Sequence, residues 1–154
     1  MRKYTVGMIA MAALFSGCDN SLDSIEGHKL GEPKSVIYGT NESGQLMVVM
    51  SDLPNLCEAV RSSDPPARNH FWVLSTWSLI GADETGNYVV DSYASITENG
   101  TVHEYQTESG KIDVYTMSLG HIKADVNLKF ATGDVVSAEV EGSHCDANLF
   151  VGLR

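Results

Sequence analysis

The ten residues His121 to Phe130, HIKADVNLKF, alternate strictly between polar and apolar side chains. Successive side chains of a β-strand point to opposite faces, so a period of two predicts a strand with one face in the core and one in water. A helix would place Asp125 and Lys129 on the same stripe as Ile122, which argues against a helical structure. We therefore expect a half-buried strand over these ten residues.

The neighbouring segments extend this pattern in both directions. Gly133 and Asp134 are turn residues and the alternation resumes from Val136 to Val140, which predicts a hairpin with the first strand. In residues 110–119 the apolar positions fall first on one face of a strand and then on the other. This predicts a strand whose core-facing side switches at a bulge. Further candidate strands are residues 88–93 and 101–107, with turns expected at residues 99–100 and 108–110.

Two earlier segments have a different character. Residues 46–51 (LMVVMS) and 71–80 (FWVLSTWSLI) are apolar on almost every position, which indicates strands covered on both faces. A short helix is the expected cover. It is predicted over Asp52 to Arg61, where apolar residues recur at helical spacing and Asp52 is the expected cap. The prolines at 65 and 66 cannot continue it.

These elements define the expected fold class. They amount to about eight short strands and one short helix, without the strand–helix alternation of parallel α/β folds. The sequence predicts a mainly β protein, an antiparallel β-sandwich or barrel, folded as a single domain over residues 34–154.

Charge limits the classes of partner. The chain has 154 residues with 10 basic and 20 acidic side chains, a formal charge of −10. Removing residues 1–17 takes away two basic and no acidic side chains, so the charge becomes −12. This composition argues against nucleic acid and against a polybasic membrane-binding surface. It favours a basic partner, whose association would weaken with salt.

The N-terminus indicates where the protein goes. Arg2 and Lys3 precede a run of mostly apolar residues, 4–15, that is shorter than the roughly 20 needed to span a bilayer as a helix. Residues 15–18, Phe-Ser-Gly-Cys, resemble the lipobox of bacterial lipoproteins, although Phe15 replaces the usual aliphatic residue. The resemblance implies cleavage of the signal peptide after residue 17 and lipidation of Cys18. An ordinary signal peptide and a buried core segment are the alternatives.

The lipobox resemblance implies a protein held in the bacterial cell envelope by its lipid. Asp19 resembles the retention signal that keeps lipoproteins of enteric bacteria in the inner membrane, so it favours that membrane without deciding between inner and outer. Residues 18–33 are polar and contain glycine, and we expect them to form a flexible tether. In its layout, the remainder of the chain is similar to small uncharacterised β-rich envelope lipoproteins, which implies no particular activity.

The remaining cysteines, Cys57 and Cys145, are an even number in an exported chain, and disulfides persist in oxidising compartments. We predict that they pair with each other. Two buried thiols, or a metal or redox site, are the alternatives, but the sequence contains no C-x-x-C motif.

Metal and catalytic motifs are absent from the sequence. The loop from Asp83 to Asn87 lacks the spacing of calcium-binding loops. No nucleophile elbow, phosphate-binding loop or free cysteine is present, so we expect no cofactor, no metal and no enzyme activity, with long-range carboxylate pairs left open. The five histidines show no metal-binding spacing, and only His144 stands next to a cysteine that could share a metal with it; they are His28, His70, His103, His121 and His144.

Aromatic residues give the clearest hint of a contact surface. Trp72 and Trp77 lie five residues apart on one predicted strand and so point to opposite faces. The alternate positions that include Trp77 are more apolar than those that include Trp72, which makes Trp77 the expected core residue. Trp72 is then either packed under the helix or a second sheet, or exposed to a partner. The candidate partner surface comprises Trp72 and the loop residues Asp83, Glu84 and Asn87.

The sequence thus predicts a membrane-anchored envelope lipoprotein that acts without catalysis, as a binding or structural module for an envelope protein or a glycan. The alternative is a small envelope inhibitor, similar in layout to lysozyme-inhibitor lipoproteins, or a ligand-binding barrel. An inhibitor would present a protruding loop at residues 83–87 or 98–101. A ligand-binding barrel would contain an apolar cavity.

Overall fold

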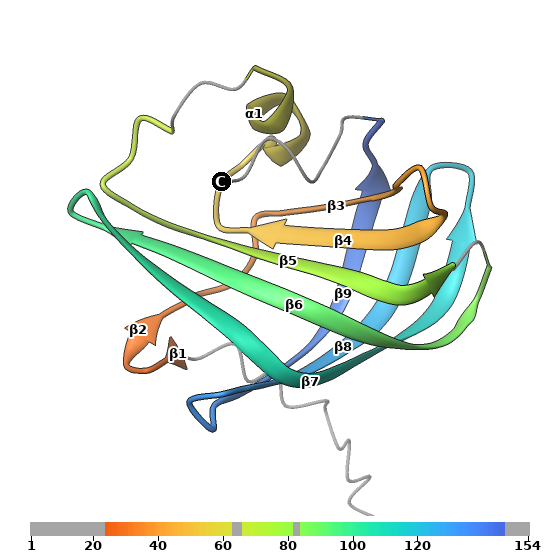
Figure 1. The fold of residues 1–154 in the computed structure, drawn as a ribbon. Coiled ribbons are helices and arrows are strands. Elements are labelled where there is room, and N and C mark those ends of the chain that lie inside the picture. Colours follow the sequence, from red (N-terminus) through yellow and green to blue (C-terminus); the bar gives the residue numbers. More distant parts are fainter. Residues whose placement is uncertain (1–23, 63–65, 82–83, 147–154) are drawn as a thin grey trace, which may run out of the picture.

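Seven strands form a closed barrel in the computed structural model, which describes residues 24–62, 66–81 and 84–146 (Figure 1). This confirms the predicted mainly β class with one helix. A separate two-stranded ribbon precedes the barrel, and a helix follows its second strand. The elements are β1 (Ser24–Ile25), β2 (His28–Lys29), β3 (Ser35–Thr40), β4 (Gln45–Ser51), α1 (Leu56–Ser62), β5 (His70–Gly81), β6 (Gly86–Glu98), β7 (Thr101–Ser118), β8 (His121–Phe130) and β9 (Val135–His144).

Each barrel strand pairs antiparallel with the next strand along the chain, and the predicted β8–β9 hairpin is confirmed. The barrel closes differently. β3 and β9 pair in parallel over only two residue pairs, Ile37 with Ser143 and Tyr38 with His144. Gly142 lies next to this seam, where an added Cβ would come within 2.8 Å of the Val36 side chain and 2.9 Å of its carbonyl oxygen. Glycine therefore permits the two backbones to approach at the closure.

β7 is longer than predicted. The sequence indicated strands at 101–107 and 110–119 with a turn between them, but one strand of 18 residues covers both. The predicted turn is instead an irregularity in the pairing with β8, between Thr107 and Ser109, and a second one follows between Val114 and Thr116. Bulges bend a strand, so this long strand can curve around the barrel. The turn at Asn99 and Gly100 is confirmed, and both residues have positive φ angles (49° and 82°).

The inward-facing side chains of all seven strands form one buried apolar cluster inside the barrel. The five apolar residues of β8, from Ile122 to Phe130, are each at most 1% exposed, as the alternation predicted. Among the largest fully buried side chains of this interior are Trp72, Phe130, Leu74, Ile96 and Ile112. A packed interior of this kind is the main source of stability for a barrel of this size.

A second apolar layer lies outside the barrel, where α1 covers β3, β4 and β5 (Figure 1). Outward-facing Met47, Val49 and Val73 pack there against Leu56 and Val60 of the helix. This confirms that residues 46–51 are covered on both faces and that the predicted helix is part of the cover, but the prediction fails at the end of β5, where Leu79 and Ile80 are 52% and 66% exposed.

The start of the helix differs from the prediction. α1 begins at Leu56, and Asp52 does not cap it: its carboxylate accepts a hydrogen bond of 2.9 Å from the backbone N–H of Trp72. The Leu56 N–H instead donates to Ser35 Oγ at 3.0 Å. A side chain from a distant strand thus satisfies one of the donors that a helix N-terminus leaves open.

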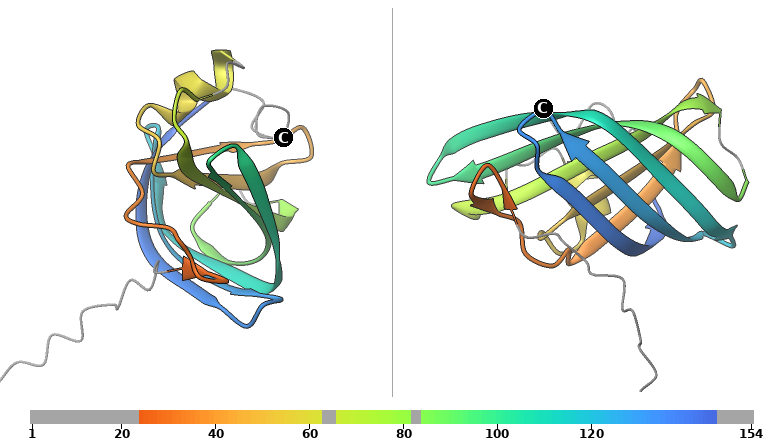
Figure 2. Two further views of the ribbon diagram at one scale, coloured as in Figure 1. Left: turned by 90° about the vertical axis from the view of Figure 1, so that its left-hand side faces the viewer. Right: turned by 90° about the horizontal axis from the view of Figure 1, so that it is seen from below.

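The predicted tether is partly folded, which corrects the expected start of the domain at Lys34. Ile25 and Leu30, on either side of the β1–β2 turn, are 0% and 2% exposed and belong to the barrel core. The Glu26 N–H donates to Asp134 Oδ2 (2.8 Å) in the β8–β9 turn. The ribbon therefore packs at the end of the barrel that carries the β6–β7 and β8–β9 hairpins (Figures 1 and 2). Two apolar residues in a polar segment give no periodic signal, so the sequence pattern could not reveal this contact.

Candidate functional site

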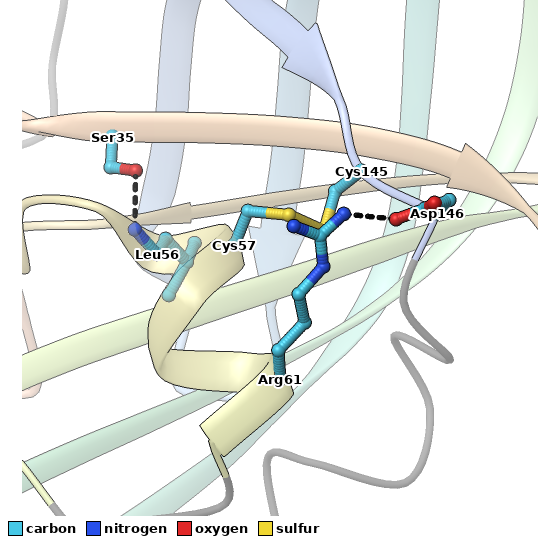
Figure 3. Close-up of a disulfide and its surroundings, with 6 residues drawn as sticks. All are labelled: Ser35, Leu56, Cys57, Arg61, Cys145 and Asp146. Carbon is cyan, nitrogen blue, oxygen red and sulfur yellow. Dashed lines mark hydrogen bonds and ion pairs between the residues drawn. A yellow bond between two sulfur atoms is a disulfide. The ribbon is translucent and has the colours of Figure 1, made fainter.

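The predicted bond between Cys57 and Cys145 is present and joins α1 to the end of β9, with 5.8 Å between the two Cα atoms (Figure 3). Cys145 is 1% exposed and belongs to the outer apolar layer. Its backbone N–H donates to the Tyr38 carbonyl of β3 at 2.8 Å. An ion pair between Arg61 and Asp146 lies beside the disulfide. The bridge thus fastens the helix directly to the seam between β3 and β9.

Trp72 is not part of an exposed surface, which corrects the predicted partner site. Its side chain is 1% exposed inside the barrel, while Trp77 is half-buried against the outer layer. The inner positions of β5 also include Thr76, whose hydroxyl accepts a hydrogen bond from Ser92 at 3.0 Å. The outer positions are more apolar because the helix and the disulfide cover them, so counting apolar residues selected the wrong tryptophan.

The remaining predicted residues lie apart from Trp72. Glu84 is exposed, and its carbonyl accepts a hydrogen bond of 2.9 Å from the Tyr88 hydroxyl. Asn87 is exposed near the start of β6, opposite Asp113 of β7. Asp83 and Cys18 lie outside the described residues. Of the predicted surface, only Glu84 and Asn87 are thus seen on the outside of the molecule.

Asn87 begins a polar row across the outer face of the barrel. Aligned positions on successive strands continue it with Asp113, Asp125 and Glu139. Partial burial raises the pKa of the Asp125 carboxyl, and the neighbouring charges of Glu139 and Asp113 raise it further. Lys123 counters part of this charge, with its Nζ 2.8 Å from Glu139 Oε1. The row therefore gathers three carboxyl groups on a face that also carries Lys111, Lys123 and Lys129.

A shallow groove of about 420 Å³ runs beside this row on the outside of β6 to β9. Val89 and Val135, which line it, are 64% and 53% exposed. Val89 pairs with Lys111, and this pair lies two residues along the strands from the pair of Asn87 and Asp113, on the same face of the sheet. An exposed apolar groove beside an acidic row is a surface that a partner can bury.

A second cluster of polar side chains lies at the end of the barrel where the ribbon packs. His28 of β2 has its Nδ1 3.0 Å from Glu98 Oε2 at the end of β6. The ring of His103, from β7, stacks on that of His28 with centroids 4.2 Å apart and an interplanar angle of 30°. His70, the first residue of β5, has its Nδ1 3.7 Å from the other oxygen of Glu98. Three histidines thus surround one carboxylate.

The sequence pattern does not reveal this cluster because its members are far apart in the chain. His28 and Glu98 are separated by 70 residues, and none of the histidines stands at the short spacing of a metal-binding motif. The β6–β7 turn and the pairing of β5 with β6 bring His70, Glu98 and His103 together. The folded ribbon supplies His28, so only the tertiary structure forms the site.

Comparison with known proteins gives no match to a family model, to a curated protein or to a solved structure. Across residues 24–62, 66–81 and 84–146, no helix has the length and hydrophobicity needed to cross a membrane.

Proposed function

We propose that this protein is a lipid-anchored lipoprotein of the bacterial cell envelope that acts by binding a partner protein on the outside of its barrel. The observation that carries the binding function is the buried interior: the inner cluster holds most of the largest fully buried side chains of the described residues, and Trp72 lies among them. A partner must therefore be met on the outer surface. The ligand-binding barrel gains no support from this packing, because a ligand needs a cavity.

The groove and the acidic row together favour a particular kind of partner. Val89 and Val135 offer apolar area in a groove that Lys111 and Lys129 also line, and Asp113 of the acidic row lies one alternate position beyond Lys111. A protein segment with an apolar side chain flanked by lysine or arginine complements both features. The disulfide and the lipobox-like sequence support an envelope location, because both belong to exported proteins.

Lipid anchoring predicts that the mature protein begins at Cys18 and carries acyl chains on that residue. Intact-mass analysis of protein purified from membranes should give the mass of residues 18–154 plus lipid. The Cys18→Ser variant should lose the acyl mass and partition into the aqueous phase of a detergent extraction, because without acyl chains the N-terminus has no stable membrane anchor. A Cys18→Ser variant that still carries lipid would contradict the anchor.

The binding surface predicts that Val89→Glu removes a partner that the wild type retains. Both Val89 and Val102 are exposed strand residues (64% and 54%), but only Val89 lines the groove, so Val102→Glu is the matched control. In situ cross-linking of the full chain in intact cells should give one partner adduct for wild type and Val102→Glu, and at least about tenfold less for Val89→Glu. An adduct of equal yield in all three proteins would exclude the groove, as would the absence of any adduct.

A further inference from the structure

The cluster at the ribbon end of the barrel contains the donor atoms that transition metals prefer. The side chains of His28, Glu98 and His103 each offer one ligand atom, and these three atoms lie within 4.8 Å of one another. Neutral imidazole nitrogen and carboxylate oxygen are ordinary ligands of zinc and of neighbouring divalent ions. Calcium and magnesium prefer oxygen alone, so the two imidazoles argue against them.

We propose that His28, Glu98 and His103 form a binding site for a divalent transition-metal ion of the zinc type. Zinc binds nitrogen and oxygen at about 2.0–2.2 Å, which places tetrahedral ligand atoms about 3.4 Å apart. The His28 Nδ1 to Glu98 Oε2 distance of 3.0 Å is already close to this value. The wider separations in the cluster close by rotation of the side chains about χ1 and χ2, without movement of the strands.

An ion pair between imidazole and carboxylate is the simpler use of such groups, but it accounts for only part of the arrangement. That pair needs His28 and Glu98 alone, whereas the ring of His103 is held 4.2 Å from the ring of His28 by a third element. His70 approaches the second oxygen of the same carboxylate (3.7 Å) and can help to orient it. Side chains from β2, β5, β6 and β7 thus gather at one place, where the stacked rings of His28 and His103 would turn to point one nitrogen each at a shared ion.

The surroundings also suit a cation. The side chains of His28 and Glu98 are 22% and 32% exposed, so an ion there would be partly shielded from water yet accessible. The net charge of −10 raises the local concentration of cations. This proposal replaces the expectation from sequence that the protein binds no metal, and it does not depend on the lipid anchor or on the groove.

A bound ion would tie the ribbon to the barrel. His28 lies on the ribbon, and the other two ligands flank the β6–β7 turn at Asn99 and Gly100. An ion that binds the folded state stabilises it by mass action, and here the gain should appear as a firmer attachment of β1 and β2.

Calorimetric titration of the chelator-treated full-length protein in detergent with zinc chloride tests the site. We expect one zinc ion per chain and a higher Tm in its presence. His103→Gln and Glu98→Gln, which keep the size of the side chains nearly constant, should each weaken zinc binding at least about tenfold, and circular dichroism should show the same strand content. His121→Gln, on β8 outside the cluster, is the matched control and should bind like the wild type.

Histidine ring signals in NMR spectra supply a second readout that a purely structural role would not change. Zinc should shift the signals of His28 and His103, assigned from the variants, and leave that of His121 in place. Absence of zinc binding by the wild type would overturn the proposal. Binding that His103→Gln and Glu98→Gln leave intact, or that His121→Gln removes equally, would overturn it as well.

Discussion

Replacing both Cys57 and Cys145 by alanine is expected to lower the free energy of unfolding by about 4–5 kcal/mol. The two residues are 88 positions apart, and a cross-link over such a long loop removes much of the conformational entropy of the unfolded chain. A small domain has a total stability of about 5–15 kcal/mol, so this loss is a large share of it. Alanine is preferred to serine because Cys145 is buried among apolar side chains and a hydroxyl there would lack a partner.

The location of the disulfide adds a local effect to this loss. β3 and β9 close the barrel over two residue pairs only, and Cys145 directly follows the last of them. Without the bridge, α1 and the end of β9 are held to the seam by the apolar contacts of the outer layer, the Arg61–Asp146 ion pair and single backbone hydrogen bonds to β3. Exposed ion pairs contribute little, so the seam should be the first part to open.

Urea unfolding of the wild type and the double variant measures the effect, each with and without a thiol reductant. The reductant should lower the wild-type midpoint to that of the variant and leave the variant unchanged. Hydrogen exchange should show that β3 and β9 lose protection before β6 and β7 do. Equal midpoints for wild type and variant under oxidising conditions would show that the bridge does not stabilise the fold.

Truncating Trp72 to alanine should cost about 3–5 kcal/mol, the range for removing a large aromatic side chain from a core. Trp72 is 1% exposed and lies within the inner apolar cluster, so its truncation removes buried contacts and leaves a cavity in the core. Within the described part of the chain, its indole N–H has no hydrogen-bond partner. Phenylalanine keeps most of the packing and removes that unsatisfied donor, so Trp72→Phe should cost less than half as much.

Unfolding curves of the two variants, compared with Val89→Ala as an exposed control, test this prediction. Val89 is 64% exposed, so its truncation should change the free energy of unfolding by no more than about 0.5 kcal/mol. A Trp72→Ala variant as stable as the control would contradict burial of the indole. Equal losses in Trp72→Ala and Trp72→Phe would mean that the indole N–H makes a contact that the packing argument omits.

Local pattern determined the elements whose two faces differ. In β8 the apolar and polar positions alternate, and a strand with this pattern can bury only one face, so its inward residues were predicted correctly from the sequence. The segments 46–51 and 71–80 lacked alternation, which predicted a cover on both faces and led to the helix. The pairing of Cys57 with Cys145 was predicted because these two cysteines remain once Cys18 is assigned to the lipid, and because the chain was expected to reach an oxidising compartment.

Only the tertiary structure decided the features for which the local sequence pattern is the same on both faces of a strand or shows no periodicity. Both faces of β5 are apolar, so only the position of α1 and of the disulfide shows that Trp72 faces the interior and Trp77 the outer layer. The ribbon is held by two isolated apolar side chains, which produce no periodic signal. The cluster of His28, Glu98 and His103 arises from strand pairing and ribbon docking across about half the chain, and no local spacing encodes contacts of that range because they depend on how distant segments pack.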